Sequence, residues 1–451
     1  MTRIIATFDN FVKAKPDTQY FWFYDLESEH HDRAEDFAQF HRMYVGNNNV
    51  MQDSFNFINI RQIPVNTPYN ICLKATIEGW RLRNVLQQIK DNKIDSLGYQ
   101  GSVPYNDYSR VLRDSENGLV DWFIDDIAEV FVNEIAFDRD LQRALGIPDK
   151  PHKLHILCGA YRNEAIEDVE KITGVRVHNA NPFEKWISLE RANTFTQQII
   201  SDIESGVERP YSSLIYNRVP RASRALLLDS MKQSGSLSKS YYSWGIDYLR
   251  NVYKGFPGGL KQFVVQGPTN FSFKGRRTIF HYIDDPGRER LNEIFDTWYG
   301  ENVQPVYFPD EIDKITLTEN QAHRTNMLHP KLCNFKVITE TVYSQYTFLT
   351  EKTFKAIQTF MPFVVFGNPQ TIENLERLGY NTYGKWIDHS YDKIWEFTPR
   401  LQALTKEIDR LSNLSPEDWA QMRLEMLPSM IYNYQHLLNN YDRTYGHVWY
   451  E

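Results

Sequence analysis

A repeated order of strand, helix and strand is the feature that most constrains this chain. Residues 153–158 fit a buried strand that ends at Gly159, residues 164–172 have helical spacing, and residues 175–178 fit a second strand. This order is typical of a parallel sheet, because the helix returns the chain to the edge where the next strand must start. The chain is therefore expected to be an α/β protein.

A second unit of the same kind lies in the C-terminal half. Residues 335–339 are apolar enough for a central strand, and residues 363–366 form a second one. Between them, Thr350 can cap a helix whose apolar face is Phe354, Ile357 and Phe360. Pro362 prevents that helix from continuing.

The length of 451 residues is too great for one ordinary core, so two domains are expected. A polar segment with Gly206 and Pro210 suggests a boundary that gives domains 1–208 and 209–398. Residues 399–451 are expected to form a helical tail that packs back on the body, with a strong helix start at Ser415 and Pro416. A further helix is expected at 119–145, and further strands at 20–24, 214–216, 263–266, 278–282 and 303–308.

Composition excludes several classes of protein. The net charge of −8 argues against a chain that binds nucleic acid over its whole surface, so any such site must be a local basic patch. The three cysteines have neither zinc spacing nor a disulfide framework, which favours a reducing compartment. No signal peptide and no membrane span are expected, so the predicted location is the cytoplasm.

Three arginines surround a predicted strand-to-helix corner: Asn217 and Arg218 follow the strand, and Arg221 and Arg224 begin the helix. A helix N-terminus carries partial positive charge, so arginines there are unfavourable unless an anion neutralises them. Together they suggest a diphosphate clamp. The alternative is that they are solvated or paired with acids elsewhere.

Two acidic residues lie at a second predicted strand-to-helix corner. Glu340 ends the strand, and Glu351 lies in the first turn of the next helix. Two carboxylates at the C-terminal edge of a parallel sheet suit the hydroxyls of ribose or hexose, and Lys352 suits a phosphate. In the alternative interpretation, Glu351 compensates the helix dipole and Lys352 is a surface charge.

These residues resemble a known family. Glu340, Thr350-Glu351-Lys352 and the strand that ends before Gly367 are similar to the donor-site motif of fucosyltransferase-like GT-B enzymes. The fuller pattern, from Asn217 through Arg224 to the block 378–392, also resembles glycosyltransferases common in tailed-phage genomes. The resemblance covers about 213–392.

The resemblance implies two Rossmann-like domains that face a cleft, with an acceptor-side N-terminal domain and a C-terminal domain for a nucleotide-sugar donor. It implies that the nucleotide sugar is a co-substrate and that the protein uses no cofactor. The donor site would comprise Asn217, Arg218, Arg221, Arg224, Glu340, Thr350, Glu351 and Lys352. One departure is Thr339-Glu340-Thr341 in place of the Phe-Glu-Asn of fucosyltransferases, which puts fucose and GDP in doubt.

Transfer also needs a base for the acceptor hydroxyl. The candidates are Asp25, at the end of the first strand, and His178, at a later strand end; a lone Asp or His there is more often a turn or core group. No metal site is expected, although Asp125-Asp126 and Asp284-Asp285 could imitate a metal motif. Asp125 and Asp126 fall within the predicted helix at 119–145, where a solvated face is expected.

The sequence leaves the identity of the acceptor open. One hypothesis is a hydroxymethylated base in phage DNA, contacted by Lys274, Arg276 and Arg277, with the host cytoplasm as the location. The alternatives are a surface glycan or a protein acceptor. From another class, the chain could be a non-catalytic nucleotide-binding or virion-associated protein. A P-loop NTPase is not expected, since no G-x-x-x-x-G-K-[ST] occurs.

Overall fold

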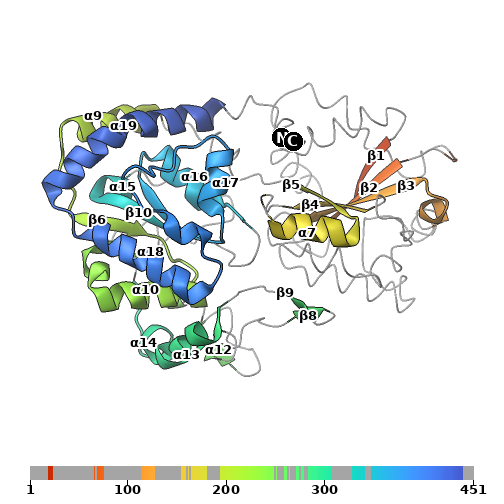
Figure 1. The fold of residues 1–451 in the computed structure, drawn as a ribbon, viewed down its shortest axis with the longest axis horizontal. Helices are drawn as coiled ribbons and strands as arrows, with labels where there is room; N and C mark the ends of the chain where they lie inside the picture. The colour runs from red at the N-terminus through yellow and green to blue at the C-terminus, as the bar shows by residue number, and fades with distance from the viewer. Residues whose placement is uncertain are drawn as a thin grey trace. The chain divides into compact units, whose positions relative to one another are not determined.

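The chain divides into two compact units (Figure 1), one of residues 1–182 with 442–451 and the other of residues 183–441. In the computed structural model, the described residues are 19–23, 65–66, 69–75, 113–126, 154–158, 161, 164–179, 193–247, 250, 259–261, 264, 271–273, 276–278, 283–306, 328–340 and 347–439.

The first unit contains a parallel sheet of five strands whose order follows the chain. The helix α7 (Glu164–Thr173) connects its last two strands and buries Ile166 and Val169. This confirms the βαβ unit expected from the sequence. The strands are β1 (Gln19–Phe23), β2 (Tyr69–Ala75), β3 (Val120–Asp126), β4 (Leu154–Cys158) and β5 (Arg176–Asn179).

The helix expected at 119–145 is wrong over its first part, because Val120–Asp126 is strand β3. This strand pairs in parallel with β2 on one side and β4 on the other. A central strand is buried on both faces, so its apolar residues run almost continuously and also match a helical spacing. Asp125 and Asp126 therefore end a strand and do not lie on a helix face.

The second unit contains a parallel sheet of four strands in the order β11-β10-β6-β7. Its central strand β10 (Cys333–Thr339) is buried at every position, as the apolar run predicts. The other strands are β6 (Tyr211–Ile215), β7 (Ser240–Tyr242) and β11 (Phe363–Phe366). The chain is therefore α/β, with a parallel sheet in each unit.

Helices pack on both faces of this second sheet. Figure 1 shows β6 and β10 between α10 (Ala222–Ser234) and α18 (Phe397–Ser412) on one side, and α9 (Asn193–Glu204) and α19 (Pro416–Asn439) on the other. The helix α16 (Glu351–Gln358) packs against α19. Shorter elements of this unit are η6 (Ser236–Lys239), α12 (Gly259–Lys261), α13 (Asp285–Glu293), α14 (Phe295–Trp298), α15 (His329–Leu332), α17 (Thr371–Arg377) and η10 (Ser390–Lys393).

Two local predictions for the C-terminal helices are confirmed. The expected helical tail contains α18 and α19, and both belong to the second unit. The hydroxyl of Ser415 accepts a hydrogen bond from the backbone N–H of Asp418 at 3.1 Å, which caps α19. No helix in the described part of the chain is long and apolar enough to cross a membrane.

The units divide at residue 182, before the boundary expected at 208. The reason is that α9, placed in the first domain by the sequence, packs against α19 of the second unit. In addition, β6 begins at Tyr211, inside the polar segment that was expected to be a linker. Of the other expected strands, residue 278 ends β9 (Arg276–Thr278), Val306 forms an isolated bridge with Trp244, and only Val264 of 263–266 is described.

Candidate functional site at the switch point of the second sheet

The direction in which the sheet is wound reverses between β6 and β10. The chain leaves β6 through α10 to reach β7, and it leaves β10 through α16 to reach β11 on the other side. All four strands are parallel, so β6 and β10 end at the same edge. Ligands of doubly wound sheets bind at such a reversal, outside the C-terminal ends of the strands.

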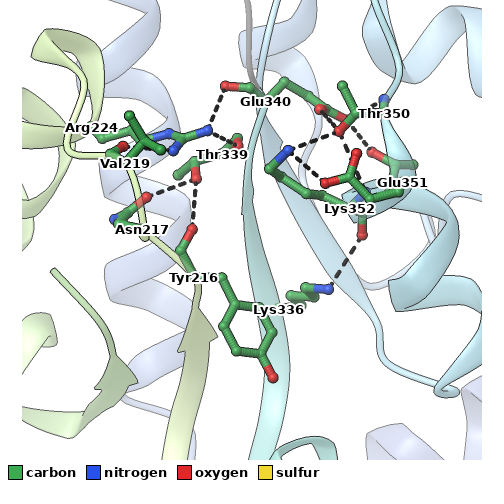
Figure 2. A network of polar contacts seen from close by, with 11 residues as sticks. Tyr216, Asn217, Val219, Arg224, Lys336, Thr339, Glu340, Thr350, Glu351 and Lys352 are labelled. Carbon is green, nitrogen blue, oxygen red and sulfur yellow. Dashed lines mark hydrogen bonds and ion pairs between the residues drawn. The ribbon is translucent and has the colours of Figure 1, made fainter. Parts of the chain in front are cut away.

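The two motifs singled out in the sequence meet at this point (Figure 2). Asn217 follows β6, Thr339 ends β10, and the hydroxyl of Thr339 donates a hydrogen bond to Asn217 Oδ1 at 2.9 Å. The Asn217 side chain is fully buried, and its Nδ2 has no hydrogen-bond partner among the described residues. The corner of arginines and the corner of acids are therefore in direct contact.

Arg224 is turned inward and joins these corners. Its side chain is only 4% exposed. Nη1 donates to the carbonyl of Val219 at 2.8 Å, and Nη2 donates to those of Thr339 at 3.1 Å and Glu340 at 3.3 Å. Burial, and then the charge of Arg221, lower the pKa of Arg224 to about 9, so the guanidinium remains charged at neutral pH. Arg224 thus holds the site together and is not an exposed arm of a clamp.

Arg218 and Arg221 are more accessible, since Arg218 is exposed and Arg221 is half-buried. Arg221 is the N-cap residue of α10, which has no side-chain cap and no acid in its first turn. The turn at Asn217 is held by Ser243, whose hydroxyl accepts from Asn217 N at 3.1 Å. Gly245 packs so closely that a Cβ there would lie 2.1 Å from the carbonyl oxygen of Arg218. This end of α10 suits an anion.

The carboxylate of Glu340 is occupied by the start of α16. Oε1 accepts hydrogen bonds from the backbone N–H of Thr350 at 3.1 Å and from the hydroxyl of Thr353 at 2.7 Å, and Oε2 accepts from the hydroxyl of Thr350. The side chain is 4% exposed. At Gly367 a Cβ would lie 3.2 Å from Glu340 Cγ, so this glycine leaves room for the glutamate. Glu340 therefore positions the Thr350–Lys352 segment.

We expect Glu340→Ala to lower the free energy of unfolding by about 2 kcal/mol, because the donors of Thr350 and Thr353 would be left buried without an acceptor. Urea denaturation at pH 7 measures this change. The control is Glu373→Ala, which removes only an exposed ion pair with Arg377 and should cost less than about 0.5 kcal/mol. Equal losses in the two variants would contradict the role given to Glu340.

Glu351 and Lys352 form an ion pair at the edge of the site. Lys352 Nζ lies 3.0 Å from Glu351 Oε1, and the two side chains are 21% and 19% exposed. Burial alone would raise the pKa of Glu351, but Lys352 and Lys355, together with hydrogen bonds from Lys352 and from the backbone, lower it to about 2. Glu351 is therefore ionised at neutral pH, and both side chains are accessible enough to contact a ligand.

Lys336 is a residue of this cluster that the sequence reasoning missed. It lies within β10, is 4% exposed, and donates to the carbonyl of Lys352 at 3.3 Å. Its Nζ also lies 5.3 Å from the ring centre of Tyr216 (Figure 2). The available signal was a lysine between the apolar residues Phe335 and Val337 of a predicted central strand, since lysine is rarely buried unless it is paired.

Of the remaining candidates, Asp25 and Lys274 lie outside the described residues. His178 belongs to β5 of the first unit, while Arg276 and Arg277 lie in β9, which pairs antiparallel with β8 (Phe271–Phe273). Asp284 caps α13 by accepting from Gly287 N at 3.0 Å, and it also accepts from Thr398 N at 2.8 Å, so it has a structural role.

Comparison with known proteins adds little to this geometry. No protein-family model matches the chain, and no curated protein matches it. Among solved structures, the chain is similar to the N-terminal domain of Candida albicans trehalose-6-phosphate phosphatase, with 8% sequence identity and a TM-score of 0.31. That match covers 94% of this chain and 87% of the other. A likeness this distant indicates neither a ligand nor an activity.

Proposed function

We propose that the second unit binds a nucleotide sugar and that the protein is a glycosyltransferase. One observation carries the proposal: Arg224 of α10 donates to the carbonyls of Thr339 and Glu340, and the Glu340 carboxylate accepts from Thr350 N, so the starts of α10 and α16 lie together. A cationic helix start and an ionised carboxylate thus lie close to the switch point of a parallel sheet. This combination suits a ligand with a diphosphate at one end and hydroxyls at the other.

Each residue has a role in this proposal. Arg218, Arg221 and the N-terminus of α10 hold the diphosphate, and Lys352 contacts a phosphate oxygen. Glu351, which is ionised, accepts hydrogen bonds from hydroxyls of the sugar or the ribose. Arg224, Glu340 and Thr350 position these groups and do not themselves contact the donor. Of the donor site predicted from the sequence, the residues proposed to contact the donor are therefore the more accessible ones, Arg218, Arg221, Glu351 and Lys352.

In the reaction, the bond between the anomeric carbon and the diphosphate breaks, and the electron pair leaves with the diphosphate. The acceptor oxygen bonds to the anomeric carbon and gives its proton to a base. Arg218, Arg221 and Lys352 stabilise the charge that develops on the leaving group. We further propose that the two units form a GT-B enzyme in which the first unit supplies the acceptor side, with Asp25 and His178 as the candidate bases.

A thermal-shift screen tests donor binding without knowledge of the acceptor. UDP-, GDP-, ADP- and dTDP-sugars are each added over a range of concentrations. At about 100 times Kd, the right donor should stabilise the protein by about 2.7 kcal/mol, which should raise Tm by several degrees. The free sugar and the free nucleoside are the controls, since neither carries a diphosphate. The absence of a shift with all four classes would contradict the proposal.

Slow hydrolysis of the bound donor separates an enzyme from a protein that only binds nucleotides. Released sugar should accumulate in proportion to protein concentration, because a site built for transfer also admits water. A donor that binds and stays intact would favour the non-catalytic alternative. Transfer to duplex DNA with hydroxymethylated bases, compared with transfer to a simple glycan, would then identify the acceptor class; salt should weaken only the former steeply.

A further inference from the structure

Trp395 is an exposed aromatic residue in the short segment between η10 and α18. It is 39% exposed, although tryptophan is highly buried on average. Among the described residues, none forms a hydrogen bond or an aromatic ring contact with its indole. The ring is therefore available to a ligand, and its place in the fold decides which ligand it could meet.

Two contacts place this segment at the C-terminal end of β11. The ring of Phe397 lies 5.8 Å from the ring of Phe366, the last residue of β11. On the other side of Trp395, the carbonyl of Asp392 accepts a hydrogen bond from Gln370 N, just after β11, at 2.9 Å. Since β6, β10 and β11 are parallel, the backbone of Trp395 lies at the edge where the candidate site lies.

The end of β11 adjoins the corner of acids. Glu340 N donates to the carbonyl of Phe366 at 3.0 Å, and Gly367 packs closely against the side chain of Glu340. The carboxylate of Glu340 in turn holds the start of α16, where Glu351 lies. Contacts thus connect the end of β11 to the ionised carboxylate of the site.

Along this edge, the groups occur in the order in which a nucleotide presents its own parts. Arg221 follows β6, Glu351 follows β10, and Trp395 lies at the end of β11; these three strands are neighbours in the sheet. Neighbouring strands lie about 4.8 Å apart, so the row extends over roughly 10 Å across the sheet. A cation, a carboxylate and an aromatic ring in this order match a phosphate, the hydroxyls of a ribose and a nucleobase.

This position distinguishes Trp395 from the other large apolar side chains that are exposed on the described part of the second unit. Val207 precedes β6 and Leu328 precedes β10, so both lie toward the opposite edge of the sheet, while Leu424 and Tyr432 lie on α19. Single exposed apolar residues are common on protein surfaces. Within this described set, Trp395 alone shares an edge with the charged groups of the site.

We propose that Trp395 stacks on the base of the nucleotide, with the ribose at Glu351 and the diphosphate at Arg218 and Arg221. The inference rests on the proposed function and deepens it, because it gives the direction in which the nucleotide lies across the ends of β6, β10 and β11. Every base has a π face, so stacking of this kind adds affinity without selecting one base.

Isothermal titration calorimetry with UDP, GDP, ADP and dTDP tests the stacking. Trp395→Ala should weaken binding of the preferred nucleotide by at least about fivefold, as is usual when a base loses an aromatic partner. Trp395→Phe keeps an aromatic face and should retain most of the affinity. Inorganic pyrophosphate, measured by its competition with the nucleotide, has no base and should bind the wild type and Trp395→Ala equally.

The control is Tyr432→Ala, which removes an exposed aromatic ring of α19 that stacks on His436 and should bind nucleotides as the wild type does. Because Trp395 is exposed, its variants should keep Tm within a few degrees of the wild type. Unchanged nucleotide affinity in Trp395→Ala would overturn the inference, as would an equal loss of pyrophosphate affinity, and both results would leave the proposed function standing. A wild type that binds none of the four nucleotides would overturn both.

Discussion

Arg224→Met is expected to lower the free energy of unfolding of the second unit by about 3 kcal/mol. The substitution leaves the carbonyls of Val219, Thr339 and Glu340 without their donors in a buried region, and each such group costs on the order of 1 kcal/mol or more. For a unit of this size, Tm should fall by roughly 6 to 12 °C. Urea denaturation and thermal melting both measure the effect.

Arg221→Met is the matched comparison, since the two arginines are three residues apart on the same helix start. Arg221 is half-buried, and its side chain makes no capping hydrogen bond. Its replacement should change stability by less than about 0.5 kcal/mol, as is usual for surface positions. The role assigned to Arg224 would be refuted if the Arg224 variant kept the wild-type Tm and lost only nucleotide binding, because that is the behaviour of a clamp residue.

Arg221→Ala and Glu351→Ala are each expected to abolish sugar transfer, with a loss of at least about 100-fold in kcat/KM, while Tm stays within a few degrees of the wild type. Removal of one group that stabilises developing charge commonly costs about 10² to 10³ in rate. Arg221 would stabilise the leaving diphosphate, and Glu351 would orient hydroxyls through its ionised carboxylate. Initial rates at several donor concentrations separate weaker binding from slower chemistry.

Two exposed ion-pair residues serve as controls for these variants. Arg377→Ala removes a cation of α17 that pairs with Glu373, and Glu293→Ala removes an anion of α13 that pairs with Arg290. Each should keep full activity. Full activity in Arg221→Ala or Glu351→Ala would instead remove that residue from the site, whatever the controls show.

Local signals in the sequence were sufficient for several elements. The strand at 363–366 has the bounds expected from its apolar run, and α16 begins after Thr350, whose hydroxyl accepts from Lys352 N at 3.4 Å. Ser415 caps α19 as expected. Such signals are readable because a cap, a proline or an apolar run acts on residues within one or two turns of itself.

Distant contacts decided what local signals could not. The segment 120–126 is a strand because β2 and β4 pair with it on either side, although its apolar spacing also fits a helix. The boundary at 182 depends on the packing of α9 against α19. Lys336 escaped notice because its neighbours in sequence are apolar, and its charged neighbours come from α16.

The sequence by itself determined the α/β class, the capped start of α16, and the two segments that carry the candidate site. Only the tertiary structure decided which charged groups are accessible. Arg224 and Arg221 look alike in the sequence, yet Arg224 bonds to the carbonyl of Thr339, 115 residues away. The reason is that parallel pairing of β6 with β10 brings the two corners together, and burial there requires every carbonyl to find a donor.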